Sequence, residues 1–214
     1  VLQFEPYGGP IDILASTPVA DIPMGEFWVP NSTGIRGEVA GASRAAGARI
    51  IGAEAFTGAP QQSQWVEDPA YLKRSGDYAF LSGVNRLILH HWVHQPYDDK
   101  YKPGMGMGWW GTHFGRHQTW AKAGKAYFDY LARCQAVLQH GEQVVDYLTI
   151  GKYTGGDAIA WRDFIRQARV ENGQVVLSSG RKYKFVQLVD NAAVQPELLE
   201  KIYALLKEGG VFVA

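Results

Sequence analysis

The sequence predicts an α/β protein whose first part is half of a (β/α)8 barrel and whose second part is a smaller, open α/β domain. Strand, loop and helix alternate along the chain, and the expected strands are continuous apolar runs, as is typical of parallel strands covered on both faces. Carboxylates and histidines stand near the C-terminal ends of successive strands, where a barrel of this type assembles its active site. About four strands are expected up to Trp92, half of the number in a complete barrel.

The composition excludes several classes of function. The chain has 214 residues, 46% of them hydrophobic and 20% charged, and no apolar run approaches the length of a membrane span. Its 21 basic and 21 acidic residues cancel, so neither nucleic acid nor a membrane surface is an expected partner. Cys134 is the single cysteine, which excludes an intramolecular disulfide, and its apolar helical context favours a buried thiol.

The first elements are two strands followed by a helix. Val1–Phe4 is expected to be a strand and leads directly into Glu5. A second strand, around Ile22–Trp28, contains Glu26, and a Pro-Asn-Ser-Thr segment then ends the strand and offers a helix cap. The helix that follows spans about residues 34–46, because small and apolar residues recur there at helical spacing.

The same alternation continues through the middle of the chain. Ala48–Thr57 is a buried type of strand with Glu54 near its C-terminal end. Asp68-Pro69 predicts the start of a helix that runs to about Phe80, since Asp is a good N-cap and Pro suits the first turn. A short apolar strand (87–89) and, later, the longest helical pattern (119–139) complete this part.

The segment from Asn85 to Trp120 has the most unusual composition. Five of the six histidines lie between His90 and His117, with several tryptophans among them, and the Gly- and Pro-rich stretch 102–108 is unsuited to a regular element. A long loop dense in Trp and His is a poor core but a good wall for a flat, hydroxyl-rich ligand. The expected ligand-binding residues are Trp28, His90, His91, His94, Trp109, Trp110, His113 and Arg116.

The character of the sequence changes after Gly141, so we predict domains at residues 1–141 and 142–214. The second domain is expected to be a small α/β domain of amidotransferase-like type, truncated at its C-terminus and without catalytic residues. Its expected elements are strands near 144–148 and 183–189, a helix over 161–168, a hairpin at Asn172-Gly173, an amphipathic helix over 196–207 and a final strand at 211–213.

Three glutamates, Glu5, Glu26 and Glu54, are the candidate catalytic residues. Each lies at or near a strand end beside an aromatic residue, where a carboxylate can act as general acid, general base or nucleophile. For any one of them the alternative is a structural carboxylate paired with an arginine such as Arg36 or Arg86. Three in register beside a Trp-rich loop favour catalysis.

Metal binding is a competing hypothesis. Two pairs of histidines stand four residues apart, His90 with His94 and His113 with His117. The sequence has no HExxH motif and no pair of cysteines, so hydrogen bonding to ligand hydroxyls is favoured over zinc. Asp98 and Asp99 are either solvated charges or ligands of a calcium ion, and the solvated interpretation is favoured. No cofactor is therefore expected.

Several long motifs resemble the large α-L-rhamnosidases of glycoside hydrolase family 106. They are GEFW (Gly25–Trp28), AEAFTG (Ala53–Gly58), the segment Asp68–Pro96, GMGWWGTHFGRHQTW, YLARCQAVLQHG (Tyr130–Gly141) and VENGQVVLSSGRKYKFVQLVD. The resemblance covers most of the chain, including the second domain. It implies the C-terminal half of the catalytic barrel, a carbohydrate substrate and a bacterial enzyme with a periplasmic or secreted location.

The resemblance also implies a reaction. Terminal α-L-rhamnose would be released from glycans or glycosides with inversion, and Glu26 or Glu54 would be the general base. The general acid would lie on an earlier strand outside this chain, unless Glu5 takes that role. The expected partner is therefore the rest of a larger polypeptide or an upstream half-barrel chain. The alternative from another class is a carbohydrate-binding fragment without catalysis.

Overall fold

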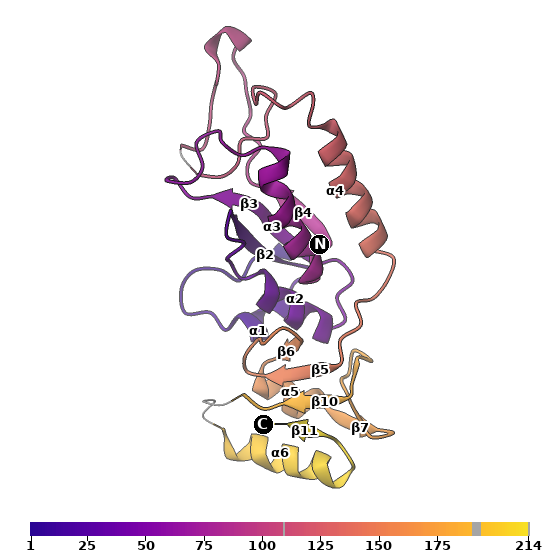
Figure 1. The fold of residues 1–214 in the computed structure, drawn as a ribbon. Coiled ribbons are helices and arrows are strands. Elements are labelled where there is room, and N and C mark those ends of the chain that lie inside the picture. Colours follow the sequence, from indigo (N-terminus) through magenta and orange to yellow (C-terminus); the bar gives the residue numbers. More distant parts are fainter. Residues whose placement is uncertain (109, 190–193, 214) are drawn as a thin grey trace. The chain divides into compact units, whose positions relative to one another are not determined.

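The computed structural model describes residues 1–108, 110–189 and 194–213, which divide into two compact units (Figure 1). The first unit combines Val1–Met24, Gly37–Ile51 and Glu142–Ala214, and the second combines Gly25–Arg36 with Gly52–Gly141. The chain passes from the second unit to the first between Gly141 and Glu142, and two N-terminal segments belong to the same unit as the C-terminal part. In the described part of the chain, no helix has the length and apolarity that crossing a membrane requires.

The expected parallel strands are present. One sheet has the strand order β1 (Gln3–Phe4), β2 (Ile22–Val29), β3 (Gly52–Gly58) and β4 (Arg86–Leu89). β1 pairs with β2 in parallel, and β3 pairs with β4 in parallel with Glu54 opposite Ile88. The prediction of an α/β protein with parallel sheets is confirmed.

Two helices cover β3 and β4 in the second unit (Figure 1), α3 (Pro69–Leu81) and α4 (Lys125–Leu138). The Asp68 side chain accepts a hydrogen bond from the backbone N–H of Tyr71, as expected of an N-cap. α4 begins later than predicted, because turns occupy residues 115–124. Cys134 is partly exposed rather than buried, since α4 turns Tyr127 and Leu131 inward instead.

The core of the second unit joins this sheet to its helices. Gly76 of α3 makes room for the Phe56 ring, because a Cβ at Gly76 would stand 3.2 Å from Phe56 Cζ. The buried members of this core are Phe27, Val29, Ala53, Ala55, Phe56, Leu72, Ala79, Val84, Phe114, Tyr127 and Leu131.

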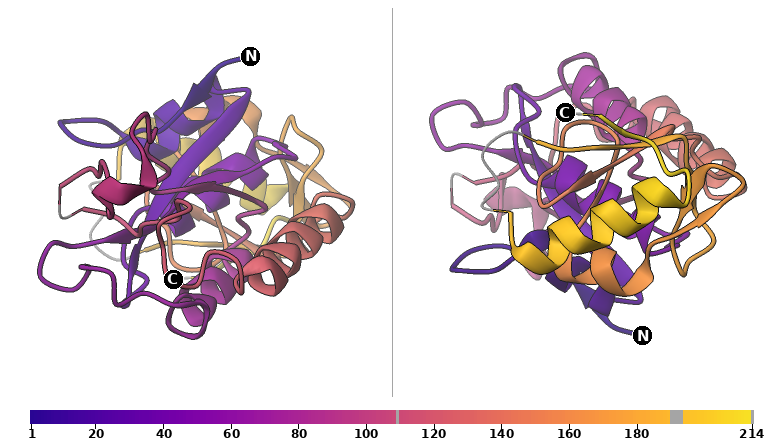
Figure 2. Two further views of the ribbon diagram at one scale, coloured as in Figure 1. Left: turned by 90° about the horizontal axis from the view of Figure 1, so that it is seen from above. Right: turned by 90° about the horizontal axis from the view of Figure 1, so that it is seen from below.

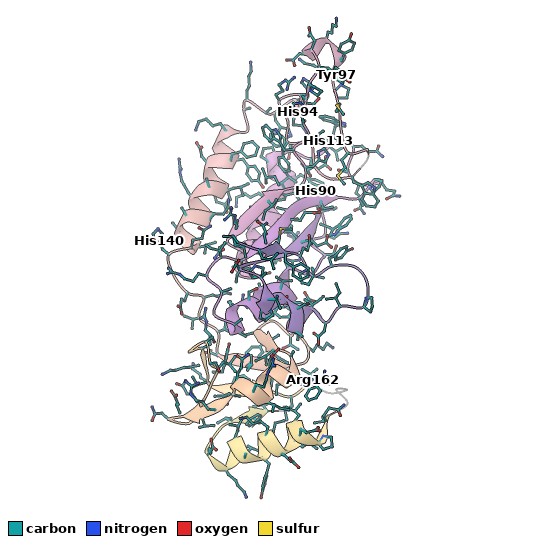
Figure 3. All side chains as sticks on the ribbon, turned by 180° about the vertical axis from the view of Figure 1, so that it is seen from behind. His90, His94, Tyr97, His113, His140 and Arg162 are labelled. Carbon is teal, nitrogen blue, oxygen red and sulfur yellow. The ribbon has the colours of Figure 1, made fainter. Side chains whose placement is uncertain are left out.

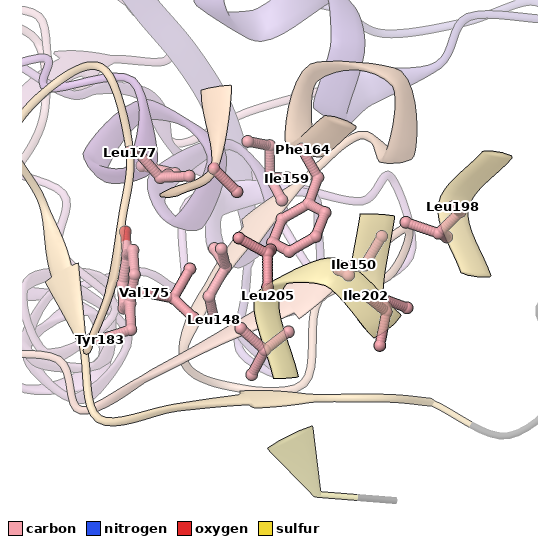
Figure 4. Close-up of a cluster of buried hydrophobic side chains, with 13 residues drawn as sticks. Leu148, Ile150, Ile159, Phe164, Val175, Leu177, Tyr183, Leu198, Ile202 and Leu205 are labelled. Atoms are coloured by element: carbon pink, nitrogen blue, oxygen red, sulfur yellow. The ribbon is translucent and has the colours of Figure 1, made fainter. Parts of the chain in front are cut away.

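The first unit contains a second parallel sheet, with the order β11 (Phe212–Val213), β10 (Phe185–Gln187), β5 (Tyr147–Ile150) and β6 (Asp157–Ile159). Helices α5 (Trp161–Gln167) and α6 (Pro196–Lys207) pack against each other (Figure 2). Leu198, Ile202 and Leu205 of α6 enter a cluster with strand residues (Figure 4). This cluster is built mainly by the C-terminal segment, and Ala45 near the N-terminal end of the chain also contributes to it.

A small antiparallel sheet contains the predicted hairpin. Its strands are β7 (Arg169–Glu171), β8 (Gln174–Val176) and β9 (Lys182–Tyr183). Asn172 and Gly173 connect β7 to β8 with φ angles of 51° and 76°. Positive φ at both positions is the geometry of a type I′ turn, for which Asn-Gly is the preferred sequence.

The remaining helices of the first unit are α1 (Ile13–Ser16), the 3-10 turn η1 (Thr17–Val19) and α2 (Arg36–Ala45). Gly37 of α2 lies against Tyr153, and a Cβ there would come 2.5 Å from the Tyr153 ring. Arg44 of α2 forms a buried ion pair with Asp157 of β6, with Nε 2.6 Å from Oδ1. Tyr183 donates a hydrogen bond of 2.8 Å to the other oxygen of Asp157.

Candidate active site

Glu26 lies in the second half of β2, which continues to Val29, and is almost fully buried. Side chains alternate between the two faces of a strand, so Glu26 and Trp28 share one face while Phe27 points to the helix-covered core, where its ring meets Phe56 at 5.0 Å. Glycine is required at position 34 because a Cβ there would stand 2.5 Å from the Glu26 carbonyl oxygen. The loop after β2 therefore folds back tightly against the backbone of Glu26 and Phe27.

The environment of Glu26 favours its protonated form. Burial raises the pKa of Glu26 above its ordinary value, and a hydrogen bond from the Trp28 side chain opposes that rise. The negative charge of Glu54, on the neighbouring strand β3, raises the pKa of Glu26 further. The structure thus brings together two of the three predicted catalytic glutamates.

Glu54 lies on the neighbouring strand β3 in a more open position. Its side chain is 28% exposed, and its Oε1 lies 3.6 Å from His90 Nδ1. The Thr57 hydroxyl donates a hydrogen bond of 2.5 Å to the same oxygen. Glu54 is therefore oriented by its neighbours and still accessible to solvent.

The loop after β4 leaves and returns at one place beside these carboxylates. His91 N donates to Thr112 O at 2.8 Å, and Thr112 N donates to His90 O at 2.9 Å. We call residues 92–108 the tongue. Met107 of its returning part places Sδ 3.2 Å from His90 Nε2, so a continuous series of contacts runs from the tongue through His90 to Glu54.

Side-chain hydrogen bonds hold the tongue together and join it to residues 116 and 117. The Gln95 side chain makes hydrogen bonds to both backbone groups of Met105. Asp99 accepts from Arg116 and His117, each at 2.9 Å, and these two partners lower its pKa to about 2. Figure 3 shows His90 and His113 at the base of the tongue and Tyr97 at its outer end.

Three of the predicted histidines form an aromatic cluster at this base. The His113 ring stacks on Trp65 at 4.0 Å and meets His91 at 4.7 Å, and His90 lies 5.6 Å from His91. Burial, followed by the nearby His113 and His90, lowers the pKa of His91 to about 4. Burial also lowers the pKa of His113, and the charge of Glu67 opposes that change. His91 therefore presents a neutral imidazole near pH 7.

Comparison with known proteins identifies the family of the chain. The model of glycoside hydrolase family 106, described as alpha-L-rhamnosidase, matches residues 8–214. The chain belongs to this family. The motifs GEFW and AEAFTG, which led to that expectation, contain Glu26 and Glu54.

Two relatives in the comparisons are similar over nearly the whole chain. A rhamnosidase from Novosphingobium sp. PP1Y has a solved structure with a TM-score of 0.83 and 27% identity over 94% of this chain. A Formosa agariphila protein, provisionally named a beta-glucuronidase, is 35% identical over 96% of this chain. The chain spans 21% of the length of the first and 19% of the second.

Other residues predicted for the family 106 site have varied positions. The Trp110 ring meets Trp28 edge to face at 5.7 Å and remains 45% exposed. His94 is exposed on the tongue, and the Arg116 side chain forms an ion pair with Asp99. Trp109 lies outside the described residues. Glu5 directly follows β1, half-buried in the first unit.

Sequence reasoning missed several polar residues of this site. Glu67 is buried and accepts a hydrogen bond from Ser63, whose hydroxyl also lies 2.7 Å from the Gly111 carbonyl oxygen. Trp65 and Thr57 were also missed. Trp65, in the loop between a strand and the Asp68-Pro69 helix start, is the one sequence signal that could have indicated these residues. Among the residues that the structure describes, no three His, Cys, Asp or Glu side chains gather as metal ligands.

Proposed function

We propose that this chain is the C-terminal half of a catalytic (β/α)8 barrel, with its following domain, from a larger glycoside hydrolase. The enzyme removes terminal α-L-rhamnose from glycans or glycosides by an inverting acid/base mechanism. The observation that carries the proposal is the pair of carboxylates on adjacent strands, with Glu26 buried and Glu54 partly exposed. A buried and a solvent-accessible carboxyl group can take different acid/base roles.

Glu54 is the general base in this proposal. An inverting base must be ionised and must reach a water molecule beside the anomeric carbon, and the two catalytic carboxyl groups lie roughly 6.5–9.5 Å apart to leave room for that water. The partly exposed position of Glu54 and the hydroxyl donated by Thr57 suit this role. The general acid belongs to an earlier strand outside this chain, and Glu5 is the second candidate for it.

Glu26 has a different role. Because burial raises its pKa, it retains a proton more readily than an ordinary glutamate and can donate a hydrogen bond to a sugar hydroxyl. Its link to Trp28, whose ring meets Trp110, connects the carboxyl group to an aromatic surface. The apolar face of a deoxy sugar such as rhamnose, with its methyl group, suits such a surface.

The side chains of the histidine cluster and of Arg116 also favour rhamnose over a glucuronide as the substrate. A glucuronide carries a carboxylate and calls for a cation at its binding site. The pKa of His91 is lowered to about 4 and that of His113 is lowered as well, so neither ring is disposed to carry a positive charge. Arg116 is held by Asp99 at 2.9 Å. These features favour a neutral sugar.

The test is turnover by the full-length enzyme that carries this chain. We expect hydrolysis of an aryl α-L-rhamnoside, weak or no hydrolysis of the matching aryl β-D-glucuronide, and loss of activity in Glu54→Gln. Preference for the glucuronide would contradict the proposed substrate. Binding of rhamnosides without turnover by the intact enzyme would support the carbohydrate-binding alternative instead.

A further inference from the structure

The strand that carries Glu54 breaks the regular alternation of side chains. In an undistorted strand, residues two apart share a face and residues three apart point to opposite faces. Phe56 would then share the face of Glu54, and Thr57 would point away from it. The contacts are the reverse: Phe56 packs into the core against Phe27 and Tyr127, and Thr57 donates its hydroxyl to Glu54 Oε1 at 2.5 Å.

The backbone at Phe56 explains this reversal. Phe56 has a φ of 66°, in the left-handed region that bulky residues rarely adopt. The regular ladder with β4 reaches only to Ala55, whose carbonyl oxygen accepts from His90 N at 3.0 Å. One residue in this conformation shifts the alternation by one position, as a β-bulge does, and turns the next side chain to the other face.

Neighbouring groups hold the bulge in place. The Thr112 hydroxyl donates to the Phe56 carbonyl oxygen at 2.9 Å, and Gly111 N donates to the Gly58 carbonyl oxygen at 2.9 Å. The Phe56 side chain is fully buried, with rings of Phe27 and Phe114 at 5.0 and 5.9 Å. A strained backbone conformation persists where surrounding contacts determine it in this way, and such strain is common beside active sites.

From this geometry we infer that Thr57 is a positioning residue for the Glu54 carboxylate, placed there by the left-handed conformation of Phe56. This inference rests on the proposed function, in which Glu54 is the general base. The hydroxyl holds one oxygen of the carboxylate in a fixed orientation through its donated hydrogen bond. The other oxygen stays available to the attacking water.

The decisive experiment compares Thr57→Val with Thr57→Ser in the full-length enzyme. Valine keeps the shape of the buried side chain but removes the hydroxyl, while serine keeps the hydroxyl. We expect Thr57→Val to lower kcat by about 10- to 100-fold with little change in KM, the size of effect that misplacement of a reacting group produces. Thr57→Ser should restore kcat.

Each outcome bears on a separate claim. A Thr57→Val enzyme with a wild-type kcat would overturn the inference while leaving the proposed function intact. A lower melting temperature, with a loss of activity that Thr57→Ser does not restore, would show that Thr57 only stabilises the bulge, and would also overturn it. A wild-type enzyme that hydrolyses neither an aryl α-L-rhamnoside nor an aryl β-D-glucuronide would refute the proposed function, and with it the assignment of Thr57.

Discussion

Replacement of Glu54 by glutamine tests which of the two carboxylates takes the proton. The amide has the shape of the carboxylate, and its oxygen can still accept the hydrogen bond from Thr57 Oγ1. In the wild-type structure this atom lies 2.5 Å from Glu54 Oε1. The side chain is 28% exposed, so the change removes little packing. What the variant loses is a base, and a positioned base typically contributes about 10²–10⁴-fold to the rate. That loss corresponds to about 2.7–5.4 kcal/mol in the activation barrier.

The assay is steady-state hydrolysis of an aryl α-L-rhamnoside by the full-length enzyme, with the melting temperature measured in parallel. Glu26→Gln is the matched control. Glutamine mimics the protonated form that burial favours at Glu26, so this variant should lose much less of its kcat than Glu54→Gln. Azide should partly rescue Glu54→Ala by attacking the anomeric carbon in place of water. If Glu54→Gln retains near-normal kcat while Glu26→Gln is inactive, the assignment of the base to Glu54 is wrong.

Three further predictions concern stability and binding. Arg44→Met should lower the free energy of unfolding, measured by chemical denaturation, by about 3–5 kcal/mol, because the buried Asp157 then lacks its ion-pair partner. A double variant that also carries Asp157→Asn should be more stable than Arg44→Met alone. Trp110→Ala should raise KM for a rhamnoside with little effect on the melting temperature, since this ring is 45% exposed and contacts Trp28; a sharp fall in the melting temperature would make it a core residue. The protein should lose stability as the pH falls from 6.5 towards 4, because burial lowers the pKa of His91 from 6.5 to about 4. In this pH range the unfolded chain binds a proton at His91 that the folded protein does not, which favours unfolding. Melting curves should show a smaller loss of stability for His91→Gln.

Elements set by local signals were predictable from the sequence. Asp68-Pro69 starts α3 as expected, since a side-chain cap and a fixed φ act within one turn. Asn172-Gly173 forms the expected turn for the same reason. Glu26 and Glu54 were grouped from the sequence because both were expected in strands of one parallel sheet; β3 starts only at Gly52, however, so Glu54 lies in its first half and not near its C-terminal end.

The details of the site could not be predicted, because they depend on contacts between distant segments. The left-handed Phe56 is held by Thr112, 56 residues further along the chain. Regular alternation would place Thr57 away from Glu54, so strand periodicity alone gives the wrong face. The Asp99 carboxylate, interpreted as solvated or as a calcium ligand, is paired with Arg116 and His117, which lie 17 and 18 residues away.

The stereochemistry of the reaction is the sharpest test of Glu54 as an inverting general base. Proton NMR spectra recorded in the first minutes of hydrolysis of an aryl α-L-rhamnoside by the full-length enzyme distinguish the anomers of the released sugar before they equilibrate. We expect β-L-rhamnose to form first, since a water molecule activated by Glu54 attacks the face opposite the leaving group. Initial release of α-L-rhamnose would indicate two displacements through a covalent intermediate, and would contradict the assignment of Glu54 as an inverting general base.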